Sequence, residues 1–242
     1  MTPLLEIEGV EKNFGGLVAV NKVSLAIRQS ETVGLLGPNG SGKTTLLNMI
    51  SGAVAPSAGL IRLRGEKISS LSPHRISHKG VARTFQLVRI LPSLSVRENV
   101  VTALAFGTNP LWGDAATRLA MEKLELVGLE TRALERPGNL TYIDQKRLEL
   151  ARALASQPAL LLLDEWLAGL NPTELDASIG LIQTLKSEGI CILLVEHIMA
   201  AVRALCERSI VMNVGAVIAD GPTEVVLKED AVIKAYLGED YA

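Results

Sequence analysis

The sequence is poor in aromatic residues and cysteines. Phe, Trp and Tyr make up 3% of the 242 residues, whereas apolar residues as a whole make up 48%. This aliphatic composition is typical of an α/β protein packed by Leu, Ile, Val and Ala, and it argues against an aromatic-rich β-sandwich. The two cysteines, Cys191 and Cys206, lie in apolar periodic segments. We expect them to be small core residues of a cytosolic chain rather than a disulfide or a metal-binding pair.

An excess of charge and a long apolar run are also lacking. Lys and Arg number 24 against 26 Asp and Glu, so no net field favours nucleic acid as the main partner. Apolar runs such as residues 159–163 are far shorter than the roughly 20 residues that a membrane helix needs. The segment that follows Met1-Thr2-Pro3 alternates apolar and polar residues, unlike a secretory signal peptide. Any membrane association is therefore expected to be peripheral.

Hydrophobic periodicity changes along the chain. Alternation in residues 4–10 and 23–27, with a turn at Gly15-Gly16, predicts a small antiparallel sheet. Helix signals dominate residues 87–139, including a capping box from Ser95 to Glu98. Strands are predicted at residues 32–36, 60–63, 81–85, 159–163, 190–195, 209–213 and 216–219, and helices at residues 44–50, after Thr141 and after Asn171. Strands separated by helices predict a mainly parallel sheet.

A glycine-rich segment between a predicted strand and a predicted helix fits the pattern G-x-x-x-x-G-K-[ST]. It comprises Gly37, Pro38, Asn39, Gly40, Ser41, Gly42, Lys43 and Thr44, and Thr45 follows it. Glycine lets the backbone turn tightly enough to aim N–H groups at phosphate oxygens, and the helix N-terminus adds a partial positive charge. In this motif Lys43 reaches the β- and γ-phosphates, and the Thr44 hydroxyl coordinates Mg²⁺. The segment therefore predicts an ATP site.

A second polar element follows a buried strand. The apolar run 160–163 ends in Asp164 and Glu165. Many strands end in acidic turns, so this pair indicates a nucleotide site only in combination with the glycine-rich loop. Beside a bound nucleotide, Asp164 is expected to hold Mg²⁺ through water, and Glu165 to orient and polarise the attacking water.

Together these motifs resemble the ATP-binding cassette (ABC) ATPases, and the resemblance covers nearly the whole chain. It implies an α/β fold in which a P-loop NTPase core with a mainly parallel sheet carries an N-terminal antiparallel β subdomain and a helical subdomain. Residues 1–242 would then form a single ABC ATPase domain, with a RecA-like core at about 1–86 and 157–242 and a helical lobe at about 87–156. The implied cofactors are ATP and Mg²⁺.

Three more positions match residues to which this family gives a role. Phe14 stands where the family stacks an aromatic ring on adenine. Gln86 matches the Q-loop glutamine, which contacts Mg²⁺ and the water and relays toward the membrane partner. His197 matches the switch histidine at the γ-phosphate. The resemblance thus implies catalytic roles for Glu165, His197 and Gln86, and a Mg²⁺ site formed by Thr44, Gln86 and Asp164.

The chain departs from the family at two places. The signature, usually L-S-G-G-Q, reads Leu140, Thr141, Tyr142, Ile143 and Asp144. In the family it closes in trans on the γ-phosphate held by the other subunit, where glycine allows a close backbone approach. Tyr142 and Ile143 place bulk at this point, and Trp166 replaces the usual Pro ahead of the D-loop at residues 167–172. These changes are either tolerated variation or a loss of hydrolytic rate at the composite site.

Short segments at residues 14–20, 168–172 and 235–239 resemble the ATPases of branched-chain amino acid importers, whose relatives include urea and amide importers. The resemblance implies a peripheral subunit at the cytoplasmic face of the inner (plasma) membrane. It would pair with a sibling ABC ATPase, as a homo- or heterodimer, with integral membrane permease subunits, and indirectly with a periplasmic solute-binding protein. Residues 87–94 would contact a permease coupling helix.

Two alternatives remain open at this point. One is a soluble ABC ATPase acting on nucleic acid or the ribosome, and the other is the ATPase of an ABC exporter. Repair-type relatives need a long coiled coil, and translation-type relatives carry two cassettes in one chain. Neither feature is visible in the sequence, so no nucleic acid partner is expected.

Overall fold

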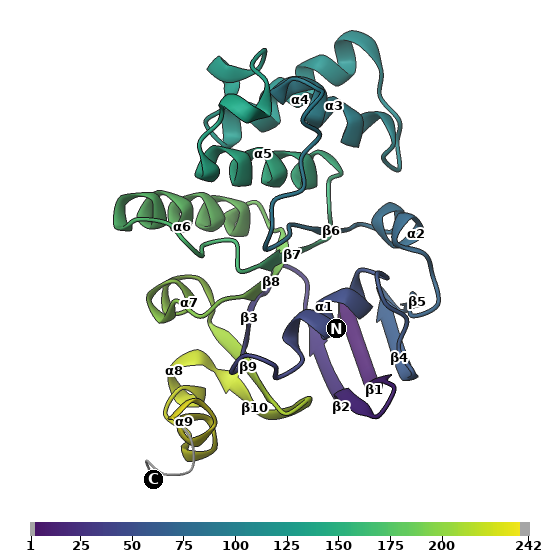
Figure 1. Cartoon of the computed structure of the whole chain (residues 1–242). Helices are drawn as coiled ribbons and strands as arrows, with labels where there is room; N and C mark the ends of the chain where they lie inside the picture. Colours follow the sequence, from purple (N-terminus) through teal and green to yellow (C-terminus); the bar gives the residue numbers. More distant parts are fainter. Residues whose placement is uncertain (1–2, 238–242) are drawn as a thin grey trace.

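The computed structural model describes residues 3–237, which form two β-sheets flanked by helices (Figure 1). The strands of the first sheet are β1 (Leu5–Phe14), β2 (Leu17–Ile27), β4 (Ala58–Leu63) and β5 (Glu66–Lys67). Those of the second sheet are β3 (Thr32–Leu36), β6 (Val81–Arg83), β7 (Leu160–Asp164), β8 (Cys191–Val195), β9 (Arg208–Asn213) and β10 (Ala216–Pro222). The first sheet has the order β2-β1-β4-β5 and is antiparallel, as predicted for the N-terminus. The second has the order β10-β9-β3-β8-β7-β6 and is parallel except for the β9–β10 hairpin.

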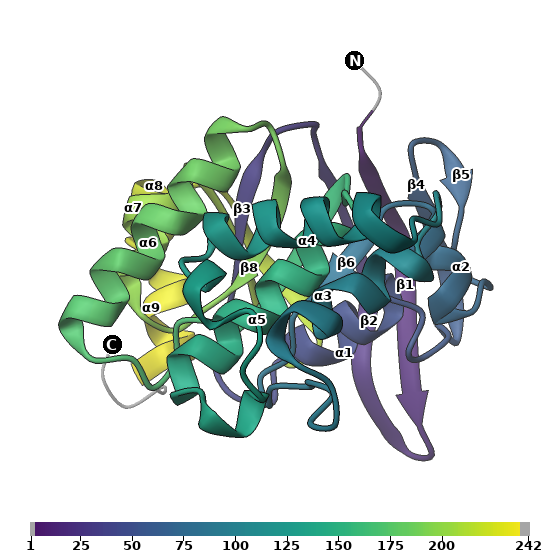
Figure 2. The ribbon, with the colours of Figure 1, turned by 90° about the horizontal axis from the view of Figure 1, so that it is seen from above.

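The helices are α1 (Lys43–Ile50), α2 (Pro73–His78), α3 (Val96–Ala105), α4 (Gly113–Leu126), α5 (Tyr142–Ala155), α6 (Pro172–Ser187), α7 (Met199–Leu205), α8 (Thr223–Val226) and α9 (Asp230–Leu237), with 3₁₀ turns η1 (Glu130–Arg132) and η2 (Pro137–Asn139). Helices α3, α4 and α5 gather at one end of the molecule, at the top of Figure 1, and the view from above shows them layered over the rest (Figure 2). We retain residues 87–156 as the proposed helical lobe.

The parallel sheet separates two hydrophobic cores. In β7, Leu160 and Leu162 join a core shared with the antiparallel sheet and α1. Leu161 and Leu163 face the opposite way, into the core shared with α3 to α7. A strand that is buried on both faces has an uninterrupted apolar sequence, as this one does. The sheet is therefore packed on both faces, and the carboxyl ends of the neighbouring strands β3, β8 and β7 lie next to one another at one edge.

Local signals predicted the element boundaries well where capping is involved. The capping boxes begun by Ser95 and Asn171 are both present, and Thr141 accepts a hydrogen bond from the backbone of the third helical residue. Cys191 and Cys206 are buried free thiols, as expected.

The predicted strand at residues 81–85 is too long, because β6 ends at Arg83. The backbone N–H of Phe85 donates to the Glu149 side chain (3.1 Å), and so the chain has left the sheet by this point. The first two strands are longer than predicted, since register shifts between β1 and β2 interrupt the alternation of apolar residues.

Some predictions concern residues that the structure does not describe. Met1 and Thr2 lie outside the described range, as do Gly238 and Glu239 of the C-terminal motif. Within residues 3–237, no helix combines the length and the apolar character needed to cross a membrane.

Candidate active site

The glycine-rich loop leaves the carboxyl end of β3 and enters α1. Its backbone has positive φ at Gly37 (142°), Gly40 (79°) and Gly42 (102°), a region that favours glycine. A Cβ atom on Gly37 would stand 2.1 Å from the carbonyl oxygen of Met212, and one on Gly42 would stand 2.5 Å from that of Ala19. The loop therefore follows its path only with glycine at both of these positions.

Lys43 lies over the loop at the first position of α1. Its ammonium donates to the carbonyl oxygens of Gly37 (2.7 Å) and Pro38 (3.0 Å). Burial lowers the pKa of Lys43, and the nearby Glu165 and Asp164 carboxylates act against that shift. The cation is thus held beside the backbone N–H groups that the motif uses for phosphate.

A pocket of about 420 Å³ surrounds this loop. It is lined by Phe14, Leu17, Val18, Ala19, Asn39, Gly40, Ser41, Gly42, Lys43, Thr44, Thr45, Glu165 and Val214. The Lys12 ammonium lies over one face of the Phe14 ring, 5.0 Å from its centroid, and the side chain is still 48% exposed at the pocket. Sequence reasoning missed the aliphatic side of the pocket formed by Leu17, Val18 and Val214. The available signal was that these apolar residues stand directly beside glycine turns, where polar residues are more usual.

Glu165 and Gln86 meet at the edge of this pocket. The Gln86 Nε2 atom donates to Glu165 Oε2 at 2.7 Å, across 79 residues of sequence. Glu165 has a φ of 49°, and its backbone N–H donates to the carbonyl oxygen of Val195 (2.9 Å). A positive φ at a non-glycine residue costs energy, and it recurs at functional sites. Here it turns the carboxylate toward the pocket.

Asp164, at the end of β7, forms a buried ion pair with Arg83 at the end of β6. The Arg83 Nη2 atom lies 2.7 Å from Asp164 Oδ2, and the two side chains are only 6% and 4% exposed. The other terminal nitrogen of Arg83 donates to Asn48 Oδ1 at 2.7 Å. Sequence reasoning missed this arginine, which compensates the charge of the expected metal-binding carboxylate.

His197 follows β8, whose carboxyl end lies between those of β3 and β7. Its side chain is exposed and does not line the pocket around the loop. The fold therefore brings its segment to the correct edge of the sheet, and its catalytic role stays a proposal.

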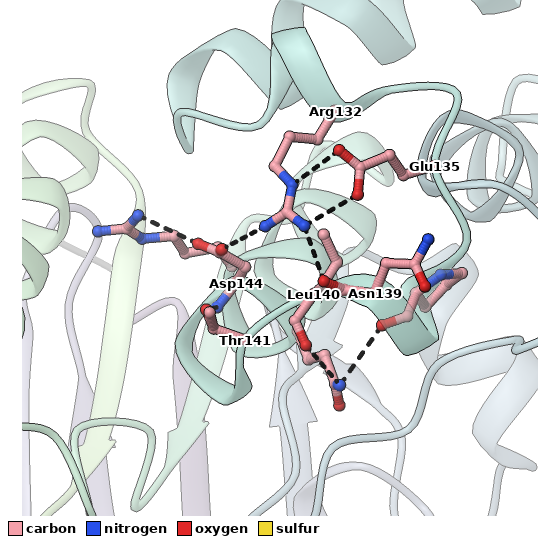
Figure 3. A network of polar contacts seen from close by, with 9 residues as sticks. Arg132, Glu135, Asn139, Leu140, Thr141 and Asp144 are labelled. Carbon is pink, nitrogen blue, oxygen red and sulfur yellow. Dashed lines mark hydrogen bonds and ion pairs between the residues drawn. The ribbon is translucent and has the colours of Figure 1, made fainter.

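The signature residues surround the start of α5, and none of them lines the pocket of this chain. Figure 3 shows how the segment is fixed: Arg132 pairs with Asp144 (2.8 Å) and Glu135 (2.9 Å) and donates to the carbonyl oxygen of Asn139 (2.8 Å). The Thr141 hydroxyl accepts from the backbone N–H of Asp144 at 3.3 Å. This network holds the first turn of α5 in one orientation.

Orientation changes the expectation for the two bulky signature residues. Ile143 is 8% exposed, so its side chain is buried within its own chain and is not offered to a partner. The structure therefore places the branched side chain away from the surface, and the effect of the altered signature on hydrolysis stays a prediction. Tyr142 is 49% exposed and remains at the surface.

Two side chains that were not predicted as site residues, Tyr236 and Glu149, also contact the backbone of the site. The backbone N–H of Gly37 donates to the Tyr236 hydroxyl (2.7 Å), which links α9 to the phosphate-binding loop. The Glu149 carboxylate accepts from the backbone N–H groups of Phe85 (3.1 Å) and Arg89 (2.8 Å), one on either side of Gln86. Burial raises the pKa of Glu149, and these two hydrogen bonds oppose the rise.

Comparison with known proteins agrees with this geometry. Residues 20–168 match the family model described as ABC transporter. The chain is 44% identical to the high-affinity branched-chain amino acid transport ATP-binding protein BraF of Pseudomonas aeruginosa, with 98% of each chain covered. It is 40% identical to the corresponding protein LivG of Escherichia coli, again with 98% of each covered.

Solved structures of ATP-binding cassettes share the whole fold. The ADP conformation of an ATP-binding cassette of an ABC transporter superposes with a TM-score of 0.88 at 28% identity, covering 99% of this chain and 100% of the other. A dimeric cassette in a post-hydrolysis state, bound to ADP and Pi, gives a TM-score of 0.82 at 27% identity, covering 90% of this chain and 98% of the other. The family match and the full-length relatives, together with a glycine-rich loop, a lysine and a glutamate around one pocket, establish that the chain belongs to the ABC transporter family as an ATPase subunit.

Proposed function

We propose that this chain is the ATP-hydrolysing subunit of an importer for branched-chain amino acids. The observation that carries the proposal is the full-length similarity to branched-chain amino acid transport ATP-binding proteins, at 44% identity for BraF. Urea and amide importers are the related solute classes against which this one has to be tested. The same similarity favours a membrane importer over a cassette that acts on nucleic acid and over an exporter.

The pocket supports nucleotide binding in two parts. Its apolar end, with the exposed ring of Phe14, suits a stacked purine. Its polar end, with the Lys43 ammonium and the loop backbone, suits a triphosphate. ATP is therefore the ligand that matches both ends.

The donor set also fits Mg²⁺, which binds hard oxygen ligands and keeps several waters. The Thr44 hydroxyl lies in the first turn of α1, and Asp164 offers a buried carboxylate at the neighbouring edge of the sheet. Because Arg83 already engages one Asp164 oxygen, we propose that Asp164 holds the ion through water and Thr44 holds it directly. Gln86 is the third proposed ligand, through its amide oxygen. The ion would supply positive charge to the phosphates.

For hydrolysis, we propose that Glu165 orients and polarises the attacking water. The hydrogen bond from Gln86 fixes the Glu165 carboxylate at the edge of the pocket. His197 would then close on the γ-phosphate after a movement of its segment, since its side chain lies outside the pocket. Turnover would also require the signature of a sibling ATPase, and one of the solved relatives is dimeric.

A second groove suits the permease subunit. It has a volume of about 410 Å³, and Phe85, Arg89, Phe106, Glu149 and Arg152 are among its lining residues. Phe106 on its rim is 71% exposed, and Leu87 of the Q-loop segment is 80% exposed. We propose that a cytoplasmic helix of the permease docks here, so that its motion reaches Gln86 through the adjoining backbone. On this proposal the chain works at the cytoplasmic face of the membrane, and a periplasmic binding protein is its indirect partner.

The test is solute uptake by the assembled transporter in vesicles. With the wild-type chain, ATP should drive uptake of leucine, isoleucine or valine, and the Glu165→Gln variant should still bind ATP while its own site loses about 10²- to 10⁴-fold in rate. An exposed-site variant, Lys228→Met, serves as the control. Uptake of urea or a short amide without uptake of branched-chain amino acids would refute the proposed solute class. Unaltered hydrolysis when Glu165→Gln is combined with the matching substitution in the sibling ATPase would refute the assigned role of this residue.

A further inference from the structure

Lys146 is a buried lysine that points at the D-loop. It lies in α5, one turn after Tyr142, and it is only 1% exposed. Its ammonium donates to the carbonyl oxygens of Trp166 (2.9 Å) and Ala168 (2.7 Å). In the described part of the chain it has no carboxylate within salt-bridge distance. A charge so placed is costly, and here its hydrogen bonds are made to one short stretch of backbone.

The opposite side of the same stretch is held by Glu196. This carboxylate is 2% exposed and accepts from the backbone N–H of Leu167 at 2.7 Å. The Lys146 ammonium donates to the carbonyl oxygens of the residues before and after Leu167, and the Glu196 carboxylate accepts from the N–H of Leu167 itself. Hydrogen bonds from these two buried side chains therefore hold three consecutive residues. The peptide dipoles between the two charges are oriented favourably toward both. Because Glu196 directly precedes His197, its hydrogen bond to Leu167 also connects the D-loop to the segment of the proposed switch histidine.

The two departures from the family meet at this point. The Trp166 indole N–H donates back to the backbone carbonyl of Lys146 (3.2 Å), and Trp166 is 1% exposed. The Lys146 ammonium lies 4.9 Å from the centroid of the Tyr142 ring. An atom added at Gly169 would contact that same ring at 4.0 Å. Tyr142 in the signature and Trp166 ahead of the D-loop are therefore parts of one cluster rather than independent changes.

We propose that Lys146 and Trp166 are positioning residues that lock the D-loop of this chain to its own signature helix. Given the proposed function, both elements serve the nucleotide site of the sibling ATPase, and the lock delivers them to that site as one rigid unit. The glycines lost from the signature are then offset by fixing its tyrosine on the lysine and the D-loop. The lock acts on the neighbouring site and leaves nucleotide binding at the Gly37 loop unchanged.

The direct test is hydrogen exchange of the isolated full-length chain. In Lys146→Met the amides of residues 166–169 should exchange about tenfold faster or more than in the wild type, because hydrogen bonds to a charged donor are lost. Trp166→Phe, which removes the indole N–H and also reduces the volume of this buried side chain while Lys146 keeps its two hydrogen bonds, should accelerate the same amides by a smaller factor. The surface variant Lys228→Met is the matched control. Unchanged exchange at these amides in folded Lys146→Met would refute the proposal that Lys146 holds the D-loop on the signature helix. If Lys146→Met does not fold, unchanged exchange in Trp166→Phe would refute it.

A second measurement separates the two nucleotide sites. In an assembled complex whose copy of this chain carries Glu165→Gln, the remaining turnover comes from the sibling's site, which uses the signature of this chain. Adding Lys146→Met should lower that turnover about tenfold, while the nucleotide Kd of the isolated chain stays within about twofold of the wild-type value. An equal turnover with and without Lys146→Met would refute the effect in trans. A wild-type complex without ATPase activity would instead refute the proposed function and leave the exchange result standing.

Discussion

Replacing Arg83 by methionine should expose how strongly the site depends on charge compensation at Asp164. The two side chains are 6% and 4% exposed and are joined at 2.7 Å, so the variant would leave a carboxylate buried without its partner. Removing one member of a buried ion pair costs about 3–5 kcal/mol. With an unfolding entropy of about 2.1 cal/mol/K per residue, 242 residues give roughly 0.5 kcal/mol/K. The expected fall in Tm is therefore about 6–10 °C.

The assay is thermal unfolding of the nucleotide-free chain, repeated with Mg²⁺ and ATP. Arg62→Met is the matched control, because Arg62 pairs with Glu6 (3.2 Å) and Glu8 (2.5 Å) through side chains that are 29%, 37% and 51% exposed. Each exposed pair contributes about 0–1 kcal/mol, and so the loss of both should move Tm by no more than about 4 °C. If Asp164 faces the metal, Mg²⁺ and ATP should raise the Tm of Arg83→Met more than that of the wild type.

A second substitution closes the test. Asp164→Asn added to Arg83→Met removes the uncompensated charge, and it should recover part of the lost stability of the nucleotide-free chain. The reasoning fails if Arg83→Met unfolds at the same temperature as Arg62→Met, or if the double variant is less stable than Arg83→Met alone.

Three further predictions concern the loop and its supports. Tyr236→Phe removes the acceptor of the Gly37 N–H and should weaken nucleotide binding about two- to tenfold in calorimetric titration; an unchanged Kd would contradict this role. Gly42→Ala should abolish measurable binding because its Cβ would lie 2.5 Å from a carbonyl oxygen, whereas Gly138→Ala, with open space around it, should bind normally. Burial raises the pKa of Glu149, so the folded state holds this proton more tightly than the unfolded state. The unfolding free energy of the wild type relative to Glu149→Gln should then fall as the pH rises above 4.5 in urea titrations, and a rise would reverse the assigned sign.

Features encoded within a few residues could be predicted from the sequence. The glycine-rich loop was found because the residue types required by its turns stand side by side. The capping box at Ser95 and the helix start after Asn171 were found for the same reason, since each signal lies within a few residues, and the structure adds a capping box at Asn171. The parallel order of the central strands followed from the alternation of strand and helix signals.

Contacts between segments that are distant in the sequence could not be predicted from it. Nothing in the sequence pairs Arg83 with Asp164, because their meeting depends on strand order. Lys146 was missed since lysine in an amphipathic helix is normally a surface residue. A signal was available in the tryptophan that replaces proline beside the D-loop. In the structure its indole N–H donates to the backbone carbonyl of Lys146, and the Lys146 ammonium donates to the backbone carbonyl of Trp166. The direction of the Ile143 side chain required the orientation of α5 as a whole.

The position of β3 has a consequence for the order in which the protein folds. Both neighbours of this strand, β8 and β9, come from residues 191–213, although the strand itself is made at residues 32–36. A chain growing from its N-terminus therefore carries an apolar strand with two unpaired edges until most of its length has been synthesised. The loop that follows this strand cannot settle earlier, since it packs against the backbone of Met212. We therefore expect nucleotide binding to begin only after residues 208–213 have been synthesised and β9 has paired with β3.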